Sequence, residues 1–124
     1  MLFAAVVLLA FLAAGAFRLL RSDLRGHRLL NAARDCNIPR ARLFLFLGSD
    51  VNYATGGGTA LHFAAMRGDT ALMEFLLRHG ANPNFAAKWS VTPLYYARTY
   101  NHPDAERILL AHGASPDTSH ITPP

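Results

Sequence analysis

Six histidines are the residues in this 124-residue chain best suited to hold a metal ion or to transfer protons. His79 and His112 lie at equivalent places in two similar stretches, four residues before Pro83 and Pro116. Because they recur along the chain, they would not converge on one ion, and we predict no metal site and no cofactor. His62 is interpreted as a structural residue. No nucleophile, base and orienting group recur at a usable spacing, so we expect the chain not to be an enzyme.

Glycines and the single cysteine offer no other chemistry. Gly56 to Gly58 lack the Lys-Ser or Lys-Thr that follows a phosphate-binding loop, which favours a flexible connection. Cys36 is the only cysteine, so no intrachain disulfide forms, and no activating histidine lies at a recognisable spacing. We therefore predict no small-molecule substrate.

The positive charge of the chain is concentrated in one segment. Seven arginines and two aspartates lie between Arg18 and Arg42, a net charge of +5, whereas the rest of the chain is close to neutral. A phosphate-binding surface needs several cations on one folded face, but this cluster adjoins an apolar segment, where arginines mark a membrane flank. We predict no nucleic-acid partner.

The amino-terminal segment from Met1 to Phe17 contains no charge, hydroxyl or amide side chain. As a helix it would be about 25 Å long, or about 30 Å if Arg18 snorkels and Leu20 is included. We predict residues 1–21 to be a transmembrane anchor or signal with a basic flank. The positive-inside rule then places the rest in the cytoplasm as a single-pass membrane protein. The small residues from Ala14 to Ala16 leave open a cleaved signal and a periplasmic or secreted product, although a basic start is missing.

Two stretches of the chain align with each other without a gap, at a period of about 33 residues. Thr59-Ala60-Leu61-His62-Phe63-Ala64 falls on Thr92-Pro93-Leu94-Tyr95-Tyr96-Ala97, and Leu76-Leu77-Arg78-His79-Gly80-Ala81 falls on Leu109-Leu110-Ala111-His112-Gly113-Ala114. A degenerate third copy precedes them by nearly the same period. In this copy Leu29-Leu30-Asn31-Ala32-Ala33 aligns with Leu61 to Ala65.

These residues resemble the ankyrin repeat, whose Thr-Pro-Leu-His-x-Ala-Ala and Leu-Leu-x-x-Gly-Ala pattern the middle copy meets almost letter by letter. The resemblance implies an all-α solenoid of stacked antiparallel helix pairs, joined by projecting loops, that grips a protein partner with its loops and its concave first-helix surface. We expect an ankyrin-repeat domain over 22–118, with copies at about 25–56, 57–89 and 90–118, and a flexible tail at 119–124.

Local signals agree with helix pairs. Thr59 and Thr92 can cap the first helices, and Pro93 suits a first helical turn. Gly80 and Gly113 supply left-handed turns that end the second helices. About three copies is the lower limit for such an array, so the outer copies must also act as caps.

Exposed aromatic and basic residues are the candidates for partner binding. Tyr53 and Phe85 each follow the Asn that ends a copy, and Trp89 lies further along the second loop, although an aromatic ring can also fold back onto the stack. Arg67 and Arg98 end the first helices, where they would receive acidic groups of a partner or stay solvated.

Phe46 and Leu47 depart from the pattern, because the middle copy has Arg78 and His79 at the equivalent positions. Apolar residues at a surface position predict packing on the anchor, on lipid or on a partner. Burial beneath residues 18–28 is the alternative.

The sequence thus favours a non-enzymatic adaptor, tethered to the membrane, that presents a repeat surface to an unidentified protein partner. Two alternatives are a secreted or periplasmic protective protein of the immunity type, released by signal cleavage, and an accessory subunit of a membrane complex.

Overall fold

The structure, a computed structural model, describes residues 2–23 and 26–116, with the backbone alone given for 16–23. Its elements are α1 (Leu2–Asp23), α2 (His27–Arg34), α3 (Ile38–Phe46), α4 (Ala60–Arg67), α5 (Thr70–Arg78), a short 3-10 turn η1 (Lys88–Ser90), α6 (Pro93–Thr99) and α7 (Pro103–Ala111). The described residues contain seven α-helices and no strand, which confirms the expected all-α fold.

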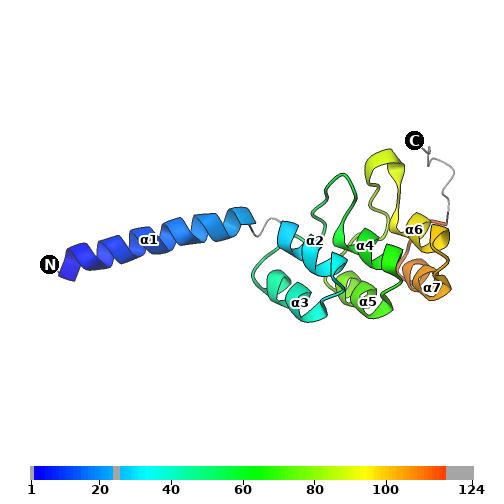
Figure 1. Cartoon of the computed structure of the whole chain (residues 1–124), viewed down its shortest axis with the longest axis horizontal. Coiled ribbons are helices and arrows are strands. Elements are labelled where there is room, and N and C mark those ends of the chain that lie inside the picture. Colours follow the sequence, from blue (N-terminus) through cyan, green and yellow to red (C-terminus); the bar gives the residue numbers. More distant parts are fainter. Residues whose placement is uncertain (1, 24–25, 117–124) are drawn as a thin grey trace.

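Three helix pairs, α2/α3, α4/α5 and α6/α7, stack side by side (Figure 1). The first helices α2, α4 and α6 form one layer, and the second helices α3, α5 and α7 form the other. Two long loops, before α4 and before α6, project beyond the first-helix layer (Figure 1). Because each pair packs mainly on its neighbours, the stack depends on contacts between adjacent copies.

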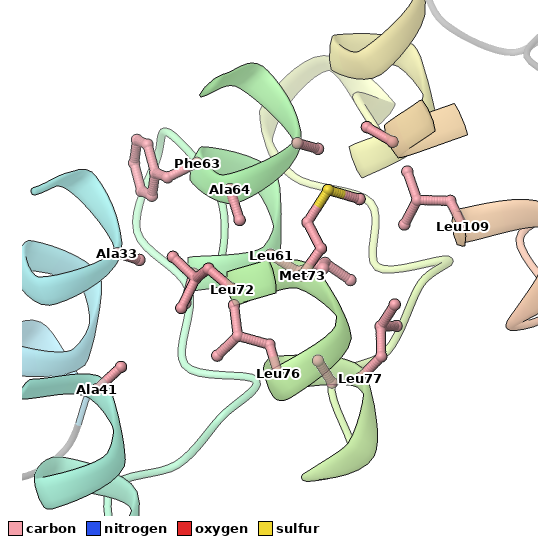
Figure 2. Packing of buried hydrophobic residues seen from close by; sticks show 14 of the residues in the cluster. Ala33, Ala41, Leu61, Phe63, Ala64, Leu72, Met73, Leu76, Leu77 and Leu109 are labelled. Atoms are coloured by element: carbon pink, nitrogen blue, oxygen red, sulfur yellow. The ribbon is translucent and has the colours of Figure 1, made fainter. Parts of the chain in front are cut away.

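The core consists of leucines and alanines that recur at the repeat period. Leu29, Leu61 and Leu94 hold equivalent places in α2, α4 and α6 and are at most 1% exposed. Figure 2 shows Leu72, Leu76 and Met73 of α5 packed beneath α4, beside the small residues that let the helices approach closely. Burying one such large side chain stabilises the fold by about 1.5–3 kcal/mol, so a few leucines per copy hold the array together.

Side chains cap the amino-terminal ends of α6 and α5, and of these two caps the sequence predicts the one at Thr92. The Thr92 hydroxyl accepts a hydrogen bond from the Tyr95 amide at 3.3 Å, and the Asp69 carboxylate accepts one from the Leu72 amide at 3.1 Å. Gly80 and Gly113 have φ values of 88° and 90° after α5 and α7, which confirms the predicted left-handed turns.

Asparagine side chains link successive copies. The Asn84 amide group donates to the Gly113 carbonyl at 2.9 Å, and its oxygen accepts from the Ser115 amide at 2.7 Å. Asn52 makes the same two bonds one copy earlier, to the Gly80 carbonyl at 3.1 Å and from the Asn82 amide at 2.7 Å. The repeat spacing therefore fixes hydrogen bonds as well as apolar contacts.

The prediction of a single-pass membrane protein is wrong. Within the residues that the structure describes, no helix is long and apolar enough to cross a membrane. Although α1 has 22 residues, its charge-free part from Leu2 to Phe17 extends only about 24 Å at 1.5 Å per residue, short of the roughly 30 Å of a hydrocarbon core. Arg18 and Arg21 follow within the same helix. The transmembrane anchor, the membrane contact through this helix and the cytoplasmic placement of the repeats lose their basis.

The described side chains of α1 are exposed. Leu2, Phe3 and Phe11 are 85%, 83% and 80% exposed, and the helix extends away from the stack (Figure 1). The tail predicted at 119–124 lies outside the described residues.

Candidate protein-binding surface

The loop between α5 and α6 presents Trp89 at its tip. The Ala87 amide donates to the Val91 carbonyl at 2.8 Å and closes the loop, and within it Trp89 and Ser90 both have left-handed backbone, with φ of 65° and 58°. The indole is 49% exposed, and the Lys88 ammonium lies 5.3 Å from its ring centroid. A large aromatic surface beside a cation is a common anchor for a protein partner.

The carboxyl ends of the first helices form a second exposed group. Arg34 ends α2, Arg67 ends α4, and Tyr100 directly follows α6. All three side chains are exposed, and the Arg34 guanidinium lies 4.7 Å above the ring of Phe63. We call Arg34, Arg67, Lys88, Trp89 and Tyr100 the candidate surface. Its two parts, the loop tip and the helix ends, together supply three cations and two aromatic rings, and arginine and aromatic residues are enriched at protein interfaces.

Tyr53 and Phe85 both fold back onto the stack. Tyr53 is half-buried, its hydroxyl lies 2.5 Å from Nε2 of His27, and its close approach leaves no space for a Cβ at Gly26, which has a φ of 124°. Phe85 is also half-buried, with its ring centroid 6.1 Å from that of His62. The structure thus places these two rings where they stabilise a loop base, and their binding role stays a prediction.

Arg98 and Arg67 lie in different surroundings. The Nε of Arg98 donates to the Glu106 carboxylate at 2.8 Å, and its Nη1 donates to the Pro116 carbonyl at 3.1 Å, which links α6 to α7 and to the chain after it. Arg67 is exposed at the end of α4. Arg67 therefore belongs to the candidate surface, whereas the guanidinium of Arg98 is already engaged within the last copy.

Phe46 and Leu47 lie on the second-helix layer, at and just after the end of α3, and so not among the loops and first helices. Phe46 is 87% exposed and Leu47 is 41% exposed. The alternative of burial beneath the preceding segment therefore does not hold for these two side chains.

Three members of the candidate surface were not identified from the sequence: Arg34, Lys88 and Tyr100. The repeat contains the signal for Tyr100, because it aligns with Arg67 of the copy before it. Arg98 instead aligns with Ala65, whose side chain is fully buried.

The titratable groups with shifted pKa values are structural. Burial lowers the pKa of His62, whose Nδ1 accepts from the Thr59 amide at 3.0 Å and whose Nε2 lies 3.0 Å from the Val91 carbonyl. Burial, together with the nearby Asp69 carboxylate, raises the pKa of the Cys36 thiol, so the thiol is not activated. Across residues 2–23 and 26–116 no three histidine, cysteine, aspartate or glutamate side chains form a group that could hold a metal ion.

Comparison with known proteins places this geometry in a family. Residues 29–120 match the family described as Ankyrin repeats, in three copies. The chain is 37% identical over 98 residues to Regulatory protein NPR6 of Arabidopsis thaliana, covering 77% of this chain and 20% of that protein. It is 36% identical over 88 residues to Probable E3 ubiquitin-protein ligase XBOS33 of Oryza sativa subsp. japonica, covering 68% and 17%. It is 40% identical over 62 residues to Protein phosphatase 1 regulatory subunit 12A of Mus musculus, covering 50% and 6%.

The chain spans no more than about a fifth of the length of these three relatives. What it shares with them is the repeat array, and ankyrin repeats imply a role in protein–protein interaction. The stacked helix pairs, the projecting loops and the family match agree: this chain belongs to the ankyrin-repeat family, with three copies of the repeat.

Proposed function

We propose that the chain is a non-enzymatic binding module that holds a protein partner between the Trp89 loop and the carboxyl ends of its first helices. The observation that carries the proposal is the Trp89 loop tip. Two successive residues there, neither of them glycine, have left-handed backbone, and such a residue costs about 1–3 kcal/mol. The loop holds a half-exposed indole in this conformation, where it offers contact area to a partner.

The charge of the candidate surface supports a partner with acidic groups. Arg34, Arg67 and Lys88 supply three cations. The Asp35 carboxylate, next to Arg34 in the chain, offsets only part of this positive charge. Exposed charges contribute little affinity singly, but complementary potentials accelerate association and exclude partners of the wrong charge. Two of the relatives bear the words "regulatory protein" or "regulatory subunit" in their names, which agrees with a module that acts by holding another protein.

Site-specific photo-crosslinking in the native cell tests the proposal. A photoreactive amino acid replaces Trp89 or Arg67 in the full-length chain, and in a control it replaces Arg107, a 78% exposed side chain of α7 in the other layer. We expect the same discrete protein adduct from positions 89 and 67 and a much weaker one from position 107. Adducts of equal yield from all three positions, or from position 107 alone, would exclude this surface.

A further inference from the structure

A second surface lies on the opposite layer of the stack, in the groove between α3 and α5. The groove has a volume of about 600 Å³ and is lined by Ile38, Arg42 and Phe46 of α3 and by Phe75, Arg78 and His79 at the end of α5. Phe46 is 87% exposed. Leu43, one helical turn earlier on α3, is 51% exposed. Covering one such ring removes a large apolar area from water, which favours binding.

The next groove along the same layer provides an internal comparison. This second groove lies between α5 and α7, and α5 takes the place that α3 has in the first groove. Thr70 and Glu74 of α5 line it, and they align with Ile38 and Arg42 of α3. Asp104 adds a second carboxylate to the lining of this groove. The fold is the same in both grooves, so the apolar and basic character of the α3/α5 groove comes from particular substitutions in the first copy.

The charge of the α3/α5 groove is one-sided. Arg42 and Arg78 lie on its two walls, and its lining contains no carboxylate. Glu74 reaches Arg78 from the neighbouring face at 3.6 Å, but the two side chains are 49% and 74% exposed, so this pair contributes little. Both arginines therefore stay able to receive carboxylates from a partner.

We propose that the α3/α5 groove binds an acidic amphipathic helix of a protein partner, with large apolar side chains that cover Phe46 and carboxylates that reach Arg42 and Arg78. A helix lying in an apolar groove is a common mode of peptide recognition, and opposite charge fixes its orientation. A second copy of this chain fits poorly, because its exposed apolar helix α1 has no carboxylate between Leu2 and Gly15 that could reach Arg42 and Arg78. This surface is separate from the Trp89 loop and does not depend on the function proposed above.

The test uses a fluorescent synthetic helix with leucines at positions i, i+3, i+4 and i+7 and glutamates elsewhere, together with a matched peptide that has lysines for glutamates. Binding to the full-length chain is measured by fluorescence anisotropy. We expect the acidic peptide to bind at least about tenfold more tightly than the basic one, because only its charges complement the groove.

Two variants place the middle copy's residues in the first copy. Phe46→Arg introduces the counterpart of Arg78, and Arg42→Glu introduces the counterpart of Glu74, both at exposed positions where the melting temperature should change little. We expect Phe46→Arg to weaken the acidic peptide at least about tenfold and Arg42→Glu to abolish or reverse the charge preference. The matched variant Ala111→Arg, in the α5/α7 groove, should leave binding unchanged.

Three results would overturn the proposal. One is equal binding of the acidic and basic peptides, and another is binding that neither groove variant alters, since the peptide would then lie elsewhere. The third is self-association of the chain, measured by sedimentation, that Phe46→Arg removes, because the groove would then hold a second copy. Unchanged melting temperatures in both variants ensure that a loss of binding reports on the groove.

Discussion

Acidification should destabilise the stack through His62. The His62 side chain is fully buried, and it connects two copies, because its Nδ1 accepts from the Thr59 amide at 3.0 Å while its Nε2 donates to the Val91 carbonyl at 3.0 Å. The Thr59 hydroxyl lies 2.8 Å from the same Nδ1. Only the neutral imidazole can make these bonds, since a proton on Nδ1 would face the Thr59 N–H.

The sign and size of the effect follow from linkage. Burial lowers the pKa of folded His62 below its ordinary value of 6.5. Below pH 6.5 the unfolded chain therefore binds a proton that the folded chain does not. Each unit by which the pH is lowered then decreases the free energy of unfolding by up to about 1.4 kcal/mol. The contribution of His62 is fully present above pH 6.5 and is lost as the pH falls toward the folded pKa.

Urea unfolding of the full-length chain, followed by circular dichroism between pH 8 and pH 5, measures this loss. His62→Gln should be less stable than wild type by about 2–4 kcal/mol at pH 7.5, from lost hydrogen bonds and altered packing, and should lose less stability on acidification. The control His79→Gln, at an exposed position, should follow the wild type. Equal pH dependence in wild type and His62→Gln, or a wild type that gains stability on acidification, would show that His62 does not cause the loss.

The same unfolding measurement checks three further variants. Asn84→Ala should lower the free energy of unfolding by about 1–2 kcal/mol, because two hydrogen bonds to the next copy are lost. The control Asn31→Ala, on an exposed part of α2, should change it little. Equal losses in the two variants would show that the Asn84 hydrogen bonds do not stabilise the stack. A chain that ends before Val91 should lose cooperative unfolding, because the middle copy loses its apolar cover; a cooperative transition would contradict this. Phe46→Arg combined with Leu47→His should change stability by less than about 0.5 kcal/mol, and a loss above about 2 kcal/mol would identify both as core residues.

Much of the fold could be predicted because its signals are local and repeated. Thr92 and Pro93 start a helix, and Gly80 and Gly113 end helices, through backbone preferences that act within a few residues. The repeat period then indicates which helices are neighbours, because each copy needs the next to cover its apolar stripe. Leu61 and Leu94, aligned in the sequence, are fully buried at equivalent places.

The amino-terminal helix shows where pattern reasoning was wrong. The apolar run from Met1 to Phe17 is long enough to span only if Arg18 snorkels and Leu20 is included. A helix is found there, but among the described residues none is long and apolar enough to cross a membrane. The apolar composition predicts the helix correctly, but the number of apolar residues before Arg18 is too small for a membrane span.

The candidate surface could be predicted only in part. Trp89 and Arg67 follow from their positions in the repeat, but the sequence does not determine which way an aromatic ring turns at a loop base. Tyr53 turns back because Gly26 leaves space beside it, and Phe85 turns toward His62. Those choices depend on contacts between residues distant in the chain, which a period cannot show.

The affinity of the partner captured at Trp89 decides whether the Trp89 loop and the first-helix ends hold that partner. Titration of the purified partner with Trp89→Ala, Arg67→Ala and the control Arg107→Ala gives the dissociation constants. We expect Trp89→Ala to weaken binding at least about tenfold and Arg67→Ala about threefold, because a central aromatic anchor contributes more than an exposed charge, while Arg107→Ala leaves binding unchanged. Equal affinities for Trp89→Ala and wild type, or a larger loss with Arg107→Ala, would show that the partner is held at another surface.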